Sequence, residues 1–278
     1  MALYFSSLNS GSNGNCYYIG NENEAVLIDV GISCKELEKR MYRCGLDIQK
    51  VKAIFISHEH SDHIKGLLVF SKKYNLPVYI TRNTLINSRL ALDSNNVISF
   101  SHLETIKIGG LKILGFSKHH DAADPFSFTI EYNNTKVGVF TDIGTVCDRL
   151  ITQFRNCNAA FLEANYDIEM LENGSYPYYL KKRIRGGKGH LSNTEALDLF
   201  VKHKPDYMSH LLLSHLSKDN NCPDLVEKLF KAVADKTFIA VASRYQESEI
   251  YFTANPINLE TEYSFNPLLH QPAQLNLF

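Results

Sequence analysis

The sequence predicts an α/β (α+β) protein in which β-sheets are covered by helices. Apolar runs of strand length, such as residues 25–28 and 53–56, alternate with segments such as 223–234, where apolar residues recur at helical spacing. Strands interleaved with amphipathic helices bury their apolar faces by packing the helices against the sheets. The middle of the chain is mostly strand and the alternation resumes after residue 146, which suggests two similar layers.

In the first half of the chain, each element follows from a local pattern. Strands are expected where short apolar runs stop at polar residues or glycine, at 3–8, 16–19, 25–28, 53–56 and 78–81. Ser33 and Glu36 form the pattern of a capping box, so a helix is expected directly after Ser33. A second helix is expected over 64–74.

In the second half, strands are expected at 105–108, 111–116, 126–132, 137–141, 159–162, 211–213 and 238–241. Asn133 and Asn134 are predicted to form a hairpin turn. Helices are expected from Tyr178, from Asn193 and over 223–234. We expect residues 1–255 to form a single domain and residues 256–278, which are interrupted by prolines, to form an extended tail.

The composition indicates a soluble cytoplasmic protein. A net charge of −1 gives no overall positive field, so a nucleic-acid partner would have to bind a local basic patch. The N-terminus lacks a basic stretch followed by an apolar one, as a secretory signal would have. No segment has the roughly 18 to 20 uncharged apolar residues that a membrane span needs, so no membrane partner is expected.

Four potential metal ligands lie within six residues directly after the strand at 53–56, in the run His58-Glu59-His60-Ser61-Asp62-His63. Imidazoles and carboxylates are ligands that zinc, manganese and iron share, and a strand-to-helix junction presents them rigidly. His58 and His60 project alike from an extended segment. Asp62 and His63 enter the next helix and can face a second ion. The alternative is a polar loop that happens to be rich in histidine.

This motif, together with Asp29 at the end of an earlier strand, resembles the metallo-β-lactamase superfamily. The resemblance implies a four-layer αββα sandwich that holds two divalent metal ions. It implies that three histidines bind one metal, that three residues bind the other, and that a carboxylate bridges both. The first metal would be bound by His58, His60 and His120, and the second by Asp62, His63 and His215. Asp142 would bridge both. The later ligands have the alternative role of capping or core polar residues.

The candidate catalytic residues are Asp62, Asp29 and His190. Two close cations lower the pKa of a shared water until hydroxide forms near neutral pH, and they stabilise charge on a phosphoryl or carbonyl oxygen. Asp29 is expected beside the ligands, where it would orient a ligand or a loop amide. The fold alone leaves the substrate open.

Three further segments resemble the YycJ/WalJ-like branch of the superfamily, namely 7–16, 189–193 and 214–221. The branch implies a cytoplasmic bacterial DNA-processing enzyme with 5′-to-3′ exonuclease activity on single strands. The resemblance extends from about residue 3 to residue 253. It departs from the branch at Asn13, where serine is common, and at Asp124, where glutamate is common.

Two places are predicted to contact a substrate phosphate. The turn around Gly11 and Gly14 can present backbone N–H groups as an anion-binding nest, formed by Ser12, Asn13, Gly14 and Asn15. Ser192 opens a capping box, which places Ser192 and His190 at a helix N-terminus suited to phosphate. We assign His190 to holding the scissile phosphate or protonating the leaving oxygen. The alternative is a structural histidine at a helix entry.

Five cations precede His190 within eight residues: Lys181, Lys182, Arg183, Arg185 and Lys188. A basic segment that leads into a metal site would follow a phosphate backbone, so these residues are predicted to form a nucleic-acid patch. A solvated helix face is the alternative. The last five residues resemble the bacterial sliding-clamp-binding pentapeptide, which predicts clamp contacts by Gln274, Leu275, Leu277 and Phe278. An apolar packing tail is the alternative there.

The sequence therefore predicts a dinuclear-metal phosphodiesterase, a 5′-to-3′ exonuclease on single-stranded DNA in repair or replication. Its cofactors would be two divalent ions, Zn²⁺, Mn²⁺ or Fe²⁺. One rival is a metal-dependent hydrolase of a small ester, thioester or lactone, which would need neither His190 nor the basic run. A second rival is a regulatory protein that keeps the fold without catalysis, which a full ligand set argues against.

Overall fold

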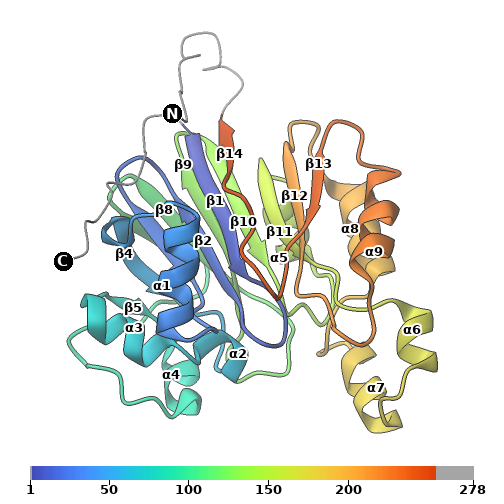
Figure 1. The fold of residues 1–278 in the computed structure, drawn as a ribbon, viewed down its shortest axis with the longest axis horizontal. Coiled ribbons are helices and arrows are strands. Elements are labelled where there is room, and N and C mark those ends of the chain that lie inside the picture. Colours follow the sequence, from blue (N-terminus) through green and yellow to red (C-terminus); the bar gives the residue numbers. More distant parts are fainter. Residues whose placement is uncertain (1, 255–278) are drawn as a thin grey trace, which may run out of the picture.

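The computed structural model describes residues 2–254, which form two β-sheets packed face to face with helices on both outer sides (Figure 1). In spatial order, the first sheet contains β14 (Tyr251–Ala254), β1 (Ala2–Asn9), β2 (Cys16–Gly20), β3 (Ala25–Ile28), β4 (Val51–Phe55), β5 (Val78–Tyr79) and β6 (Val97–Ile98). The second contains β13 (Phe238–Val241), β12 (His210–Ser214), β11 (Ala159–Glu163), β10 (Thr135–Phe140), β9 (Phe126–Tyr132), β8 (Leu111–Ser117) and β7 (Thr105–Ile108).

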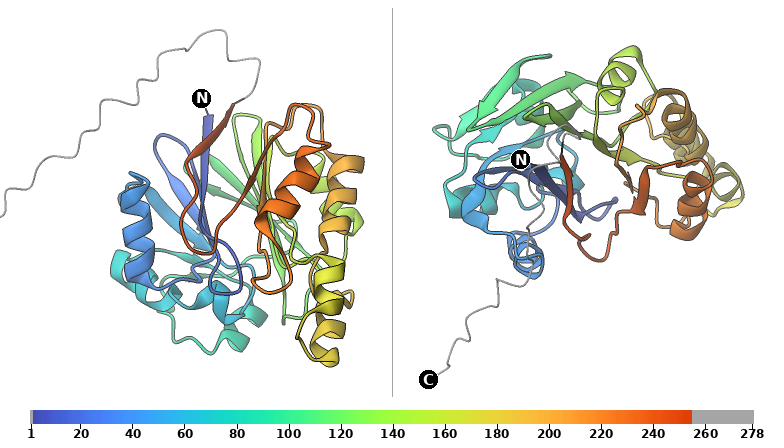
Figure 2. Two further views of the ribbon diagram at one scale, coloured as in Figure 1. Left: turned by 45° about the vertical axis from the view of Figure 1, so that its right-hand side comes forward. Right: turned by 90° about the horizontal axis from the view of Figure 1, so that it is seen from above.

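Helices cover the outer face of each sheet, as the turned views of Figure 2 also show. The first sheet is covered by α1 (Cys34–Arg43) and α3 (Leu67–Tyr74), with α2 (Ser61–Ile64) and α4 (Arg82–Ser88) at its lower edge in Figure 1. The second sheet is covered by α5 (Asp148–Phe154), α8 (Asn193–His203) and α9 (Pro223–Lys231). The helices α6 (Ile168–Asn173) and α7 (Tyr178–Arg185) lie below them. The predicted four-layer αββα sandwich is therefore confirmed.

Three apolar clusters hold the layers together. The central one lies between the sheets, where the rings of Phe5 and Phe161 meet edge to face with centroids 5.8 Å apart. The two outer clusters join each sheet to its helices, through Leu37 of α1 on one side and Phe230 of α9 on the other. Because the strands are apolar on both faces, both sheet surfaces of the sandwich are buried.

The direction of the strands brings their carboxyl ends to one side of the molecule. Strands β3 to β6 run parallel to one another in the first sheet, and β10 to β13 run parallel in the second. Side chains that follow parallel strands collect at the same sheet edge, where ligands bind in α/β proteins. This edge is where most of the predicted metal ligands lie.

The structure differs from the predicted elements in a few places. The helix expected over 64–74 is two helices, α2 and α3, separated around Gly66. A Cβ on Gly66 would lie 1.9 Å from the carbonyl oxygen of Ile32, so the chain passes too close there for a side chain. Sequence patterns also missed α4, α5, α6, β6 and β14, of which β14 pairs with β1 at the opposite end of the chain. The hairpin turn at Asn133 and Asn134 is confirmed, with both residues in the left-handed region.

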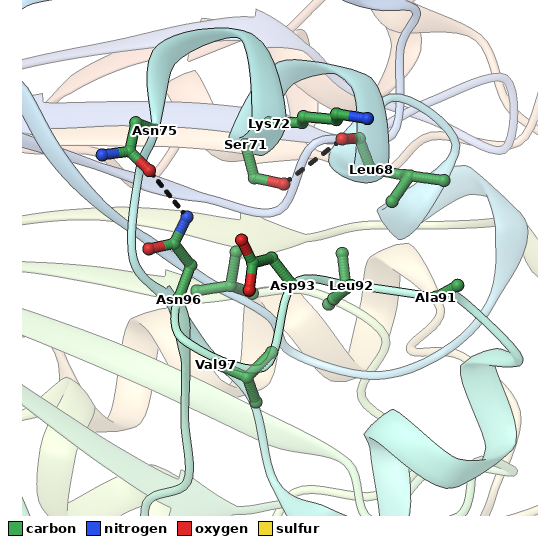
Figure 3. A pocket seen from close by; sticks show the side chains of 10 residues that line it. Leu68, Ser71, Lys72, Asn75, Ala91, Leu92, Asp93, Asn96 and Val97 are labelled. Carbon is green, nitrogen blue, oxygen red and sulfur yellow. Dashed lines mark hydrogen bonds between the residues drawn. The ribbon is translucent and has the colours of Figure 1, made fainter.

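Among the helices within residues 2–254, none has the length and apolar character needed to cross a membrane. A hollow of about 230 Å³ lies between α3 and the segment 91–97. The side chains of Asn75 and Asn96 hydrogen bond there at 2.9 Å (Figure 3). None of the predicted site residues lines this hollow.

Candidate metal centre

The predicted metal ligands converge at the carboxyl ends of strands from both sheets. His58 and His60 follow β4, His120 follows β8, Asp142 follows β10 and His215 follows β12. Two of these ligands adopt left-handed backbone conformations, with φ of 55° at Asp142 and 56° at His215. Non-glycine residues seldom adopt this region outside turns, so the surrounding structure holds these two residues in place.

The first predicted ligand triad consists of three imidazoles that face one another. Nε2 of His58 lies 3.0 Å from Nδ1 of His60, and Nε2 of His120 lies 3.4 Å from the same atom. One nitrogen from each ring lies within 4.8 Å of the others. Three nitrogens at this spacing can share one metal ion.

The second predicted triad lies beside the first. Oδ2 of Asp62 lies 3.5 Å from Nε2 of His63 and 3.5 Å from Nε2 of His215. Asp142 lies between the triads, with Oδ2 at 3.2 Å from His63 Nε2 and Oδ1 at 3.7 Å from His120 Nε2. The structure therefore places all seven predicted ligands around one buried point, with Asp142 where a bridging ligand would lie.

The centre has the buried atoms and the electrostatics that divalent cations fit. Oδ2 of Asp142 and Nε2 of His215 are buried and have no hydrogen-bond partner among the described residues. Such atoms are costly to bury, and a metal ion would satisfy both. Burial alone lowers the pKa of His215, but the neighbouring carboxylates of Asp142, Asp62 and Glu163 raise it to about 10. The carboxylates therefore favour positive charge at this point, which bound cations would supply.

A second layer of contacts orients the histidines of both triads. Oδ2 of Asp29 lies 2.7 Å from Nδ1 of His63, and the carbonyl of Gly189 lies 3.0 Å from Nδ1 of His120. The Ser57 hydroxyl lies 2.9 Å from Nδ1 of His58 and donates to Asp29. With one ring nitrogen held in this way, the other nitrogen is directed at the centre. Asp29, predicted to be catalytic, acts on the centre through His63.

Glu163 is the site residue that the sequence patterns missed. It ends β11, is completely buried, and its Oε1 lies 2.8 Å from Nδ1 of His190 and 2.9 Å from Nδ1 of His215. Burial alone raises the pKa of this carboxyl, but His190 and the two histidine hydrogen bonds lower it to about 2. The pattern that could have identified Glu163 is an acidic residue at the end of an apolar strand, the same pattern that identified Asp29.

His190 lies beside both triads. Its ring centroid is 5.3 Å from that of His120 and 5.2 Å from that of His215, and its side chain is 20% exposed. Because Nδ1 faces Glu163, the ring nitrogen left for a substrate is Nε2. The helix entry is also as expected, since Ser192 and Glu195 form a complete capping box at the start of α8.

The predicted phosphate contacts are placed differently from expectation. The N–H of Gly14 donates to the carbonyl of Gly11 at 2.9 Å, and the N–H of Asn15 donates to the carbonyl of Asp62 at 2.7 Å. These two amides are therefore not free to form an anion nest, because the first closes the turn and the second joins the turn to α2. Asn15 instead contacts Oδ2 of Asp62 through its side chain at 3.2 Å. The buried Ser192 hydroxyl is likewise engaged in its own capping box.

Ser12 and Asn13 are exposed and contact Arg244. The Ser12 hydroxyl accepts a hydrogen bond from Arg244 at 3.0 Å, and the Asn13 side chain donates to the Arg244 carbonyl at 2.8 Å. These two residues thus join the glycine-bearing turn to the chain after β13. No sequence pattern had indicated Arg244.

The predicted basic patch lies on α7 and the segment after it. Three of its five cations already have partners: Lys181 donates to the carbonyl of Glu172, Arg185 pairs with the Glu172 carboxylate, and Arg183 pairs with Asp121 at 2.5 Å. Within residues 2–254, Lys182 and Lys188 are exposed and form no ion pair, which leaves two cations for a polyanion. The predicted clamp-binding residues, 274–278, lie outside the described residues.

The chain matches known proteins in sequence and in fold. The model of the metallo-beta-lactamase superfamily matches residues 10–207. The chain is 36% identical over 251 residues to exodeoxyribonuclease YycJ of Bacillus anthracis, covering 88% of this chain and 94% of that protein. It is 33% identical over 226 residues to exodeoxyribonuclease WalJ of Streptococcus pneumoniae, covering 80% and 84%.

The crystal structure of the metallo-beta-lactamase fold protein YhfI from Bacillus subtilis has the same fold, with a TM-score of 0.69 at 18% identity over 91% of this chain and 100% of that one. The fold implies divalent metal ions, and the clustered histidines and carboxylates suit them. The chain belongs to the metallo-β-lactamase superfamily, in its YycJ/WalJ-like branch.

Proposed function

We propose that this protein is a dinuclear-metal exodeoxyribonuclease that degrades single-stranded DNA from the 5′ end. The observation that carries the proposal is the pair of ligand triads joined by Asp142. The names of the relatives, both exodeoxyribonucleases, support DNA as the substrate. Zinc, manganese and iron all suit the ligands, and the proposal names Zn²⁺ or Mn²⁺ first. The proposal includes that the protein acts on cellular DNA in the cytoplasm.

Each group of the site would have its own role in the hydrolysis of a phosphodiester. Bound at the two triads, the cations would supply a nucleophilic hydroxide and stabilise charge on the phosphoryl oxygens. His190, held through Nδ1 by Glu163, presents Nε2 to the substrate and can bind the scissile phosphate or protonate the leaving oxygen. Asp29 and Glu163 fix the orientation of the rings and of any proton they carry.

Lys182 and Lys188 would attract the phosphate backbone of a single strand toward the metal centre. They lie in α7 and in the segment that leads to His190, and Arg183 ties this region to Asp121, the neighbour of His120. A phosphate backbone that contacts these lysines is attracted by charge alone, without regard to sequence. Such binding suits an enzyme that removes successive nucleotides.

The test is to incubate the purified protein with end-labelled single-stranded DNA in the presence of Mn²⁺ or Zn²⁺. Nucleotide release from the 5′ end is expected, together with two metal ions per chain by elemental analysis. Asp62→Ala/His63→Ala should abolish release, while Asp198→Ala/His203→Ala on the outer helix α8 should retain it. Absence of degradation by the metal-loaded protein, or equal degradation by the Asp62→Ala/His63→Ala variant, would overturn the proposal.

We further propose that residues 274–278 bind the bacterial sliding clamp. The support is the pentapeptide itself, because Leu277 and Phe278 are the kind of apolar anchors that dock into a preformed groove. Deletion of residues 274–278 should weaken clamp binding in a pull-down or titration without changing hydrolysis of free DNA. Unchanged clamp affinity after the deletion would contradict this part.

A further inference from the structure

A second hollow, of about 220 Å³, adjoins the metal centre on the side of His215. It lies between the start of the glycine-bearing turn, the segment after β12 and the segment after β13. The backbone N–H of His215 donates to the Ser10 hydroxyl at 2.8 Å, and Ser10 and Leu216 both line the hollow. A group bound here would therefore lie next to a metal-ligand residue.

The lining combines positive charge with apolar walls. Lys218 and Arg244 line the hollow, and no aspartate or glutamate does. Leu216 and Val241 supply apolar surface, and Tyr245 contributes a ring that is 72% exposed. Cations beside apolar walls and an open aromatic face suit a nucleotide, whose phosphate is anionic and whose base is planar.

Arg244 lines this hollow and also holds the glycine-bearing turn. One terminal nitrogen of its guanidinium donates to the Ser12 hydroxyl at 3.0 Å. Its Nε is buried against the same turn, where a Cβ on Gly11 would lie 3.3 Å from it. Guanidinium groups bind phosphate through charge-assisted hydrogen bonds, so the charge of Arg244 favours an anionic ligand in the hollow.

The chain around Arg244 is held in place at three successive carbonyls. The carbonyl of Ser243 accepts from the N–H of Ser10 at 3.1 Å. That of Arg244 accepts from the Asn13 side chain at 2.8 Å, and that of Tyr245 accepts from Arg40 at 3.1 Å. Because this backbone is fixed before any ligand arrives, little ordering entropy is lost on binding.

We infer that this hollow binds the 5′-terminal nucleotide of a single strand, with its 5′-phosphate on Arg244 and Lys218 and its base against Tyr245. The inference rests on the proposed exonuclease function. With the terminal nucleotide held here, the first phosphodiester linkage falls at the neighbouring metal centre. The hollow thus selects the 5′ end and sets the cleavage to single-nucleotide steps.

The test is equilibrium binding of two fluorescent oligonucleotides that differ only in a 5′-phosphate or a 5′-hydroxyl. Both carry a phosphorothioate at the first linkage to slow cleavage, and binding is followed by fluorescence anisotropy with the metal-loaded protein. We expect about tenfold tighter binding of the 5′-phosphorylated strand, the size of one charge-assisted phosphate contact. Arg244→Gln and Lys218→Ala should each reduce this preference several-fold.

A matched control is Lys107→Gln, an exposed cation on β7. At the same salt concentration, this variant should show the same 5′-phosphate preference as the wild-type protein. Equal binding of the two strands by the wild-type protein, or an undiminished preference in Arg244→Gln, overturns the inference. Because binding is measured without cleavage, this result is separate from the degradation assay, whose failure would overturn the nuclease proposal instead.

Discussion

Nδ1 of His215 lies 2.9 Å from Oε1 of Glu163, and both side chains are buried at the carboxyl ends of neighbouring strands. The same oxygen lies 2.8 Å from Nδ1 of His190, so one carboxylate orients both a predicted metal ligand and the predicted proton-carrying histidine. Its other oxygen accepts from the backbone N–H groups of Ile143 and Leu191, at 2.7 Å and 3.2 Å. Glu163 thereby joins the predicted metal ligand His215 to His190.

Glu163→Gln should weaken metal binding and activity by about 10- to 100-fold, as loss of a contact behind a metal ligand does. With Nε2 directed at metal or substrate, each histidine Nδ1 carries a proton, so the carboxylate accepts from four donors. A glutamine NH₂ group must face one pair of these donors. Metal content and hydrolysis of bis(p-nitrophenyl) phosphate measure the effect. Glu131→Gln on the exposed side of β9 is the control, and equal metal content in both variants would contradict the role.

His190→Gln should lower the turnover of single-stranded DNA by about 10²- to 10⁴-fold, the contribution typical of a general acid or base. Metal content should stay unchanged, because the two predicted triads remain intact. The loss on bis(p-nitrophenyl) phosphate should be much smaller if His190 protonates the leaving oxygen, since p-nitrophenolate leaves without a proton. A similar loss on both substrates would assign His190 to phosphate binding, and full activity on both would exclude either role.

Lys182→Ala/Lys188→Ala should weaken binding of single-stranded DNA and reduce its dependence on salt. Each phosphate contact on a single strand contributes about 0.7 to the slope of log affinity against log salt concentration. The double variant should therefore lower the slope by about 1.4 in a titration against salt. Lys181→Ala is an informative comparison because Lys181 already donates to the Glu172 carbonyl. An unchanged slope in the double variant would exclude the two lysines from the path of the strand.

Gly31→Ala should destabilise the fold by about 3 kcal/mol, at the upper end of typical overpacking costs. A Cβ at this position would lie 1.7 Å from the carbonyl oxygen of Asp62 and 2.5 Å from the backbone nitrogen of Asn15. The variant must therefore move the segment that carries Asp62, so metal content should fall with stability. Urea unfolding and elemental analysis measure both. Gly45→Asn is the control, since Gly45 has a left-handed φ of 67° and open space around it.

Lys118→Met should destabilise the protein by on the order of 2 kcal/mol, the cost of disrupting a buried hydrogen bond to a charged group. The Lys118 ammonium is buried and donates to the carbonyl of Thr141 at 2.6 Å, next to the left-handed Asp142. Lys112→Met, on the strand β8 that ends just before Lys118, removes an exposed ion pair with Glu131 and should cost less than about 1 kcal/mol. Equal midpoints of urea unfolding for the two variants would contradict the role of Lys118.

Much of the fold could be predicted because its signals are local. Apolar runs of four to seven residues mark the central strands, and Ser192 with Glu195 marks the start of α8. The elements that were missed depend on distant partners: β14 becomes a strand because it pairs with β1. Gly66 divides a helical pattern because the chain near Ile32 packs against it, which spacing along the sequence does not encode.

The metal ligands could be predicted from the sequence, because His58 to His63 are neighbours in the chain and lie at the end of a strand. The residues that surround those ligands and the neighbouring turn became visible only in the folded structure. Glu163 and Arg244 show this, since one is buried beneath two histidines and the other beside a loop more than 200 residues earlier in the chain. Their roles depend on hydrogen-bond geometry and burial, which arise only when the two sheets pack together.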